Sequence, residues 1–284
     1  MGGDPRGVGF ARSRWTLRLV GAACPWLTSS SSSGVWRVLK RAGIRLKRAR
    51  SHLHSPDPAY LPKQTAITAW VARGRGRDRG TVTLFLDEVT LARQPTLAAA
   101  YAARGPVQPL AERSCRSETA TRYLATLDVA DGRVCWCRRA HITVATLVAF
   151  YRDLVAAYPE AARIVVVQDN WPVHVHPDLL VALEPQESPF PVVRPPNWPI
   201  APSAAAERRW GELQLPIQLV PLPTYASWLN PIEKLWRWLR QDVGHLHPWA
   251  DDLDALRAAA DDFLTRFAHG SPDLLRYSGL LLPE

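Results

Sequence analysis

The sequence predicts an α/β protein with a mixed β-sheet flanked by helices. Short apolar runs typical of strands alternate along the chain with segments of helical periodicity. A strand comes first and is followed by a hairpin, a helix, a second strand and further helices, an order that favours a mixed sheet. The 284 residues, 47% of them hydrophobic, suffice for a sizeable core in one large domain or two ordinary ones.

Five segments have the residue pattern of strands. Residues 81–87 are β-branched and aromatic, and the run ends in an acid. Residues 163–168 are an apolar run, as expected for a buried central strand. The others are residues 119–128 and 133–138, a hairpin that turns at Asp131-Gly132, and a short strand at 217–220.

Five further segments have helical periodicity: residues 14–27, 35–43, 143–158, 230–243 and 252–269. Serine hydroxyls at 29–33 are available to cap the second of them. By contrast, residues 185–223 contain ten prolines, which favours irregular loop.

The basic residues are concentrated at the N-terminus. The first 80 residues hold 16 basic and 3 acidic side chains, whereas the remainder holds 19 and 23, so the net charge of +9 comes from this part. We expect a basic N-terminal segment at 1–54, a linker at 55–80 and a larger domain at 81–284. Such a segment favours nucleic acid as partner, although its Arg- and Ser-rich composition also resembles a mitochondrial transit peptide. No apolar run approaches the roughly 20 residues that span a bilayer, so we expect no membrane partner.

Three acids are the candidate catalytic residues. Asp87 and Asp169 each follow an apolar run, and neighbouring strand ends would bring their side chains into one cleft. Glu233 lies in the first turn of a predicted helix. Carboxylates suit Mg²⁺, and two such ions about 4 Å apart support phosphodiester cleavage. Strand-terminal Asp residues are also common turn formers, and Asn230, Pro231 and Glu233 have the spacing of a helix-capping box.

Taken together, three sequence blocks resemble a known family. "LFLDEVTL", "VVVQDNWPVHVH" and "LPTYASWLNPIEKLWRWLR" are similar to the acid blocks of DDE transposases of the insertion-sequence 630 group, bacterial relatives of mariner elements. The resemblance covers roughly residues 30–270. It implies an RNase H-like catalytic domain at 81–284 with a Pro-rich insertion at about 185–215.

The resemblance also implies roles for individual residues. Asp87, Asp169 and Glu233 would be catalytic and would bind two Mg²⁺ or Mn²⁺ ions. Four neighbours, Glu88, Asn170, His174 and Asn230, would orient these ligands or contact the DNA backbone. The family further implies transposon ends and target DNA as partners, a homodimer on DNA and a cytoplasmic location at the bacterial nucleoid.

The chain departs from the family pattern in three places. Asp169 and Glu233 are separated by 63 residues, more than is usual in the family, and the Pro-rich insertion accounts for the excess. Residues 226–228, Ala-Ser-Trp, replace the family's Ser-Pro-Asp before the last helix. The N-terminal segment is shorter than a complete helix-turn-helix, which favours truncation upstream.

Basic side chains of the N-terminal segment are the candidate DNA contacts. They are Arg37, Lys40 and Arg41 on the predicted helix, with Lys47 and Arg48 in the tail beyond it. A solvated basic helix face is the alternative interpretation. Four arginines at 73, 75, 77 and 79 would either follow phosphates or serve as a soluble connector. Among the tryptophans, Trp171 and Trp228 are the best candidates to approach DNA.

The sequence therefore predicts a transposase of a bacterial insertion sequence that cleaves DNA ends and transfers strands. Two alternatives stay open. One is a degenerate transposase that only binds DNA, and the other is a host nuclease of the same fold that cleaves without joining.

Overall fold

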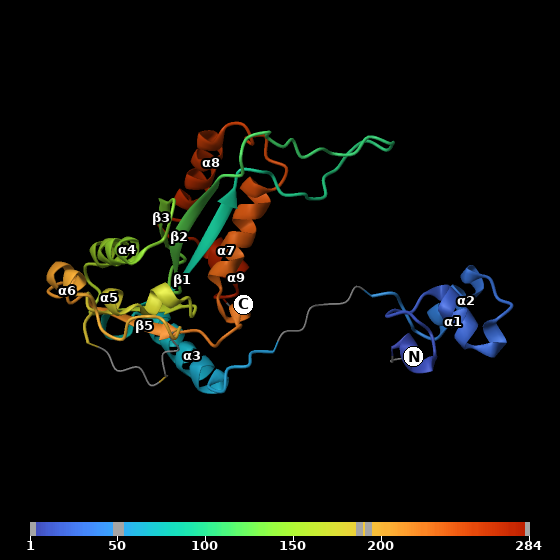
Figure 1. Ribbon diagram of the computed structural model, residues 1–284, viewed down its shortest axis with the longest axis horizontal. Helices are drawn as coiled ribbons and strands as arrows, with labels where there is room; N and C mark the ends of the chain where they lie inside the picture. The colour runs from blue at the N-terminus through green and yellow to red at the C-terminus, as the bar shows by residue number, and fades with distance from the viewer. Residues whose placement is uncertain (1–3, 48–53, 186–189, 191–194, 282–284) are drawn as a thin grey trace. The chain divides into compact units, whose positions relative to one another are not determined.

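A computed structural model describes residues 4–47, 54–185, 190 and 195–281 of the chain. The chain divides into two compact units, residues 1–52 and 53–284. Figure 1 shows both units, and each is described by itself. In the described part of the chain, no helix is long and apolar enough to cross a membrane.

The larger unit is built on a five-stranded mixed sheet, which confirms the predicted fold class. Its strands are β1 (Thr81–Ala92), β2 (Ala120–Asp128), β3 (Val134–Arg139), β4 (Arg163–Gln168) and β5 (Ile217–Pro221). They lie in the order β3-β2-β1-β4-β5. The first three pair antiparallel, whereas β4 pairs parallel with β1 and with β5. All five strands lie close to their predicted positions.

The first strand is longer than predicted, so Asp87 does not lie past its end. β1 continues to Ala92 because it stays paired with β2, where Asp87 faces Ala125. Its pairing with β4 stops earlier, at Phe85 opposite Val167. Two further residues along each strand lead to Asp87 and Asp169, so both acids lie at one level, where β1 and β4 part.

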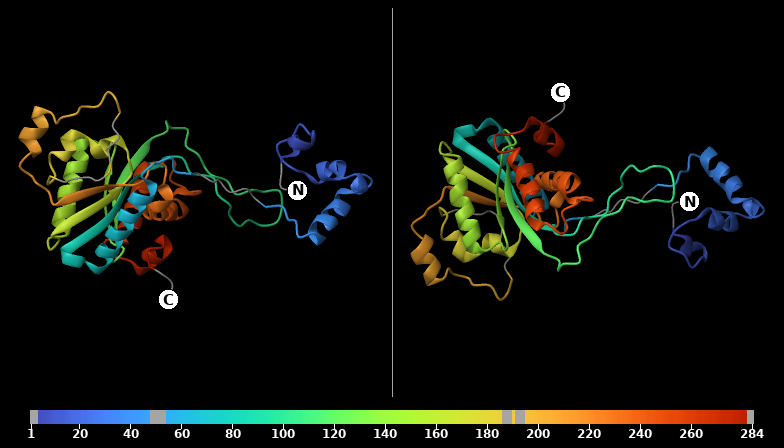
Figure 2. Two further views of the ribbon diagram at one scale, coloured as in Figure 1. Left: turned by 90° about the horizontal axis from the view of Figure 1, so that it is seen from below. Right: turned by 90° about the horizontal axis from the view of Figure 1, so that it is seen from above.

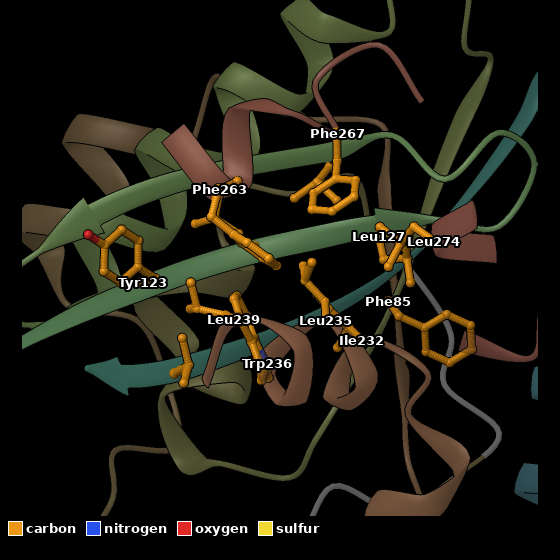
Figure 3. Close-up of a cluster of buried hydrophobic side chains, with 14 of the residues drawn as sticks. Phe85, Tyr123, Leu127, Ile232, Leu235, Trp236, Leu239, Phe263, Phe267 and Leu274 are labelled. Carbon is orange, nitrogen blue, oxygen red and sulfur yellow. The ribbon is translucent and has the colours of Figure 1, made fainter. Parts of the chain in front are cut away.

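Helices cover both faces of this sheet (Figure 2). One face packs against α4 (Val144–Ala157) and α5 (Pro177–Leu180). The other packs against α7 (Ile232–Leu239), α8 (Leu253–Thr265) and α9 (Pro272–Ser278). Figure 3 shows this second core, where leucines and aromatic side chains of α7 and α8 meet those of β1 and β2. The helices predicted at 143–158 and 252–269 are confirmed, whereas α9 was not predicted.

The predicted linker at 55–80 is wrong over most of its length, because residues Tyr60–Gly76 form helix α3. The prolines that suggested a linker are compatible with this helix, since Pro62 lies in the first turn, where an N–H needs no helical acceptor. The helix packs closely on β1: Thr83 Oγ1 donates a hydrogen bond to Trp70 O at 2.8 Å. A Cβ atom at Gly74 would lie only 2.4 Å from the Thr83 Cβ, so this approach requires glycine.

The Pro-rich region is also more ordered than predicted. Its described part contains helix α6 (Ala204–Trp210), which Ser203 caps by accepting a hydrogen bond from Ala206 N. An isolated bridge pairs Leu183 with Leu215, next to β5. A helix forms here because three alanines and a serine cap follow the last proline of the dense cluster.

The smaller unit contains α1 (Leu17–Ala23) and α2 (Ser32–Arg41), which confirms two predicted helices. A serine of the low-complexity run does cap α2, since Ser31 Oγ accepts a hydrogen bond from Gly34 N at 3.2 Å. The core is small and consists of Val20, Leu27 and Val35 with half-buried neighbours.

Short 3₁₀ segments complete both units: Pro5–Val8, Pro25–Leu27, Asp78–Gly80, Pro172–Val175 and Ser227–Leu229. A π-helical turn, Arg240–Gly244, follows α7.

Candidate active site

Asp87, the first of the three predicted catalytic acids, is more buried than Asp169. Its Oδ2 accepts a hydrogen bond of 3.1 Å from the indole Nε1 of Trp236, a fully buried residue of α7. Burial, and then the nearby charges of Glu233, Glu88 and Asp169, raise the pKa of Asp87 to about 7. No local pattern predicts the Trp236 contact, because it joins residues 149 positions apart.

Asp169 follows the end of β4, as predicted. Its Oδ1 accepts a hydrogen bond of 2.9 Å from the backbone N–H of Trp171, so the side chain is fixed by its own turn. The same oxygen lies 3.0 Å from His174 Nδ1. That distance suits an ion pair, although the two groups are not aligned for a hydrogen bond. Burial opposes ionisation of Asp169, but His174 and the Trp171 N–H outweigh it and lower the pKa of this carboxyl.

His174 is completely buried between two carboxylates. Its Nε2 lies 2.8 Å from Glu88 Oε1, while its Nδ1 faces Asp169. Burial alone would lower the pKa of His174, but the two carboxylates raise it to about 9. Because successive strand residues alternate between faces, Glu88 reaches the histidine from the face of β1 opposite to Asp87. The imidazole therefore connects Glu88 to Asp169 beneath the end of the sheet.

A buried hydrogen-bond chain holds His174 in this place. Tyr151 of α4 donates its hydroxyl to Gln168 Oε1 at 2.9 Å, and Gln168 Nε2 donates to the His174 carbonyl at 3.3 Å. Both of these side chains are buried. Neither residue was predicted as part of the site, since Gln168 reads only as the end of a strand.

Glu233 lies in the first turn of α7, but the predicted capping box does not form. The helix begins after Pro231, without a side-chain cap. The Asn230 Oδ1 is buried and has no hydrogen-bond partner among the described residues. The backbone explains this: Asn230 ends the preceding 3₁₀ turn, and its carbonyl accepts from Glu233 N at 3.2 Å. Capping therefore does not account for Glu233, whose carboxylate instead acts on the pKa of Asp87.

The turn before α7 is tied to two distant segments. Asn170, the residue after Asp169, donates a hydrogen bond from its Nδ2 to Leu222 O at 2.7 Å. This bond links the end of β4 to the turn before α7. Asp57 Oδ2 accepts from Thr224 N at 2.9 Å and also binds Lys63 Nζ at 2.8 Å, within a nearly buried ion pair. These contacts give Asn170 a structural role and fix the start of the block that carries Glu233.

The structure thus brings five predicted residues together at one end of the sheet: Asp87, Glu88, Asp169, His174 and Glu233. Among the described residues, no three acidic, His or Cys side chains are gathered closely enough to form a finished metal cage. The donors nevertheless fit a hard divalent cation, since they are carboxylates whose mutual repulsion raises the pKa of Asp87. A cation would remove that repulsion.

The predicted DNA contacts belong to the smaller unit. Arg37, Lys40 and Arg41 are exposed on α2, away from the buried Val35, and Lys47 is exposed beyond it. Lys40 Nζ also lies 5.1 Å from the Trp36 ring centroid. Arg48 lies outside the described residues. Of the four arginines at 73–79, Arg77 is engaged by Asp128 at 2.7 Å, so it is partly structural.

Removing the Asp87 charge is expected to stabilise the metal-free protein. The folded-state pKa is raised from 3.8 to about 7, so ionised Asp87 is unfavourable in the fold. That destabilisation is absent below pH 4, grows between pH 4 and 7, and is complete above pH 7. Asp87→Asn, which retains an acceptor for Trp236, should therefore gain about 2 kcal/mol at pH 8.

Thermal unfolding in EDTA at pH 5 and pH 8 checks this prediction. The difference in Tm between Asp87→Asn and the wild type should be larger at pH 8. A difference in Tm at pH 8 that is no larger than at pH 5, or is negative, would contradict the prediction that ionised Asp87 is unfavourable in the fold.

The fold and the acids at the sheet end define the RNase H-like class of protein. Three solved structures share this fold with the chain at 14 to 16% identity. They are a Mos1 transposase paired-end complex with the left transposon end and a Mos1 mariner paired-end complex with Mn, each with a TM-score of 0.58, and a complex with Mg at 0.56. The matches cover 97% of this chain and 73%, 73% and 75% of the respective chains.

Residues 82–257, more than half of the chain, match the family described as DDE superfamily endonuclease. The chain belongs to that family. A curated relative, the "Insertion element IS630 uncharacterized 39 kDa protein" of Shigella sonnei, is 22% identical over 247 residues. The match covers 86% of this chain and spans 62% of the length of that relative.

Proposed function

We propose that this protein is the transposase of a bacterial insertion element, which cuts DNA at the element ends and joins them to a target. The observation that carries the proposal is the convergence of Asp87, Asp169 and Glu233 at the point where β1 and β4 part. The family and the insertion-element relative support the same activity. The absence of a capping role for Glu233 supports it further.

In this proposal, Asp87, Asp169 and Glu233 bind two divalent ions, Mg²⁺ or Mn²⁺. When bound, such ions activate a water or a 3′-hydroxyl and stabilise the leaving oxygen of a phosphodiester. The protein's own groups fix the ligand oxygens: the Trp236 indole holds one oxygen of Asp87, and the backbone N–H of Trp171 holds one of Asp169. No side chain becomes covalently attached to DNA. The Mn and Mg complexes of the Mos1 structures are consistent with these ions.

The neighbouring polar residues position the ligands in this scheme. His174 lies between Glu88 and Asp169 and restricts both carboxylates. Asn170 holds the turn that leads to Glu233, and Asn230 lies close in sequence to Glu233 with a buried oxygen that has no hydrogen-bond partner in the described part of the chain. A residue that orients a metal ligand commonly contributes 10- to 100-fold to metal affinity or activity, about the range we assign to His174.

The smaller unit serves as the DNA-binding segment. Helices α1 and α2 with the turn at Pro25–Leu27 would be a partial helix-turn-helix, with α2 presenting Arg37, Lys40 and Arg41 to DNA. Lys47 and Arg48 would add phosphate contacts. Action on two element ends implies a homodimer on DNA, and a bacterial host implies a location at the nucleoid. The paired-end arrangement of the Mos1 complexes is in line with the dimer.

An end-processing assay tests the proposed function. Purified protein is incubated with labelled duplex that carries the element end, with and without Mg²⁺ or Mn²⁺. We expect nicking at the end only with metal, followed by strand-joined products on a second duplex. Tight binding without nicking would contradict the enzyme and support a degenerate binder, whereas nicking without joined products would support a nuclease.

A further inference from the structure

A groove of about 860 Å³ runs along α7 and contains Glu233. We call this cavity the α7 groove. Its walls come from α3, α7, the turn at Ser227–Leu229 and the residues that follow α9. It therefore lies within the larger unit and opens directly beside one of the proposed catalytic acids.

One wall of the α7 groove is a row of cations. Lys234, Arg237 and Arg240 line it from one face of α7 and the turn after it, and Arg75 lines it from α3. Among the described residues, none forms an ion pair or side-chain hydrogen bond with Lys234, Arg237 or Arg240. Glu233 is the one acid among the lining residues. The row therefore offers positive charge to an anion from outside.

The floor of the α7 groove is apolar. Ile67 and Val71 of α3 and Leu280 beyond α9 line it together with Phe85 of β1. Trp228, from the turn before α7, also lines the groove and is 49% exposed. The indole Nε1 of Trp228 donates to the Tyr60 hydroxyl at 3.1 Å, so this exposed ring is held in place. A fixed aromatic ring beside a cationic row is the arrangement that binds bases and phosphates of single strands.

We propose that the α7 groove binds a short single-stranded DNA segment that leads away from the carboxylates, with phosphates on Lys234, Arg237 and Arg240 and a base stacked on Trp228. The inference rests on the proposed function for its connection to catalysis. The row spans about 9 Å of helix axis, a length that suits a short run of neighbouring phosphates on one strand. A duplex fits less well, because it hides the base faces that an apolar floor and an exposed ring would contact.

Strand separation at the cut explains why such a groove would be useful. An unpaired strand is more flexible than a duplex, so it brings a phosphodiester more easily to acids that lie at the end of a sheet and are partly buried. Holding the unpaired nucleotides beside Glu233 would prevent their re-pairing while the bond is cut. The α7 groove would then stabilise locally melted DNA and would not recognise a particular base sequence.

Binding of labelled oligonucleotides to the full chain tests the proposal without catalysis. The probes are a 12-nucleotide single strand and the matching duplex, both in EDTA, followed by fluorescence anisotropy. Arg237→Gln with Arg240→Gln should weaken single-strand binding at least 10-fold and lower its salt slope by about 1.4, or 0.7 per lost contact. Trp228→Ala should weaken it about 10-fold, with little change in the salt slope.

A charge-matched variant separates the groove from general electrostatics. Arg208→Gln with Arg209→Gln removes two exposed arginines of α6, which do not line the α7 groove. The proposal requires the groove variant to lose more single-strand affinity than this control, and both to lose equally little duplex affinity. Equal losses for the two variants, or a parallel loss of duplex binding in the groove variant alone, would overturn it. Circular dichroism and thermal unfolding confirm that each variant is folded.

Crosslinking then locates the strand. A single strand with 5-iodouracil is irradiated on the wild-type chain, and the adduct is mapped by mass spectrometry. An adduct at Trp228 supports the proposal, whereas adducts confined to the smaller unit refute it. These binding assays use no divalent metal. If the cleavage assay contradicted the transposase proposal, the result for the α7 groove would therefore still stand.

Discussion

Asp169→Ala is expected to reduce metal-dependent DNA cleavage by about 1,000-fold or more while sparing DNA binding. The carboxylate is fixed by the Trp171 N–H and faces His174, so its loss removes a preorganised ligand oxygen and leaves the buried imidazole with Glu88 alone. Metal catalysis supplies several kcal/mol of transition-state stabilisation, and each 1.4 kcal/mol is a factor of ten in rate. Single-turnover cleavage of labelled end DNA measures the effect, and anisotropy measures binding.

Two further variants make this result specific. Asp169→Asn keeps an acceptor for the Trp171 N–H and should fail in cleavage almost as severely, because an amide is a poor ligand for Mg²⁺. Asp153→Ala removes an exposed acid from α4 and should leave cleavage unchanged. Substantial cleavage by Asp169→Asn would refute the assignment of Asp169 as a metal ligand.

Asp57→Asn is expected to destabilise the larger unit by about 3–5 kcal/mol. Asp57 and Lys63 are side chains only 6% and 7% exposed, and their 2.8 Å ion pair lies where the chain enters α3. The substitution would leave the Lys63 ammonium buried without a counter-charge. It would also weaken the contact that Asp57 makes with Thr224 N, which anchors the turn before α7. A fall in Tm of about 10 °C should result.

The pH dependence of the same ion pair has a definite sign. Burial opposes ionisation, but Lys63 and the backbone N–H groups outweigh it and lower the pKa of Asp57 below 3.8. The stabilisation is therefore complete above about pH 4 and is lost as pH falls through the lower folded-state pKa. Unfolding in urea at pH 7 and pH 3 should show a smaller difference between Asp57→Asn and the wild type at pH 3.

An exposed ion pair provides the control for Asp57. Asp254 and Arg257 lie 3.0 Å apart, but the Asp254 side chain is 89% exposed, so Asp254→Asn should lose less than 1 kcal/mol. Adding Lys63→Met to Asp57→Asn removes the orphaned charge and should restore part of the stability. If Asp57→Asn were as mild as Asp254→Asn, the pair would have no role in fixing the turn.

Local patterns were sufficient to predict most elements of the larger unit. The β-branched runs at 81–87 and 163–168, the hairpin at Asp131-Gly132 and the periodic helices are encoded by neighbouring residues, and the structure has them. Local reading failed where a local signal was ambiguous. Prolines that suit a first helical turn also suit a linker, so 55–80 was ambiguous, and the capping spacing of Asn230 and Glu233 makes no cap because Asn230 ends the preceding 3₁₀ turn.

The sequence by itself determined that two acids follow apolar runs and that a third begins a predicted helix, each within a family block, because motifs and periodicity are properties of neighbouring residues. Only the tertiary structure decided which partners these acids have. Pairing with β2 places Asp87 within a strand, and Trp236 of α7 donates a hydrogen bond to it. His174 met Glu88 across 86 residues, and the α7 groove was assembled from α3, α7 and the segment after α9. Contacts between distant segments depend on how layers pack, and no local pattern records that choice.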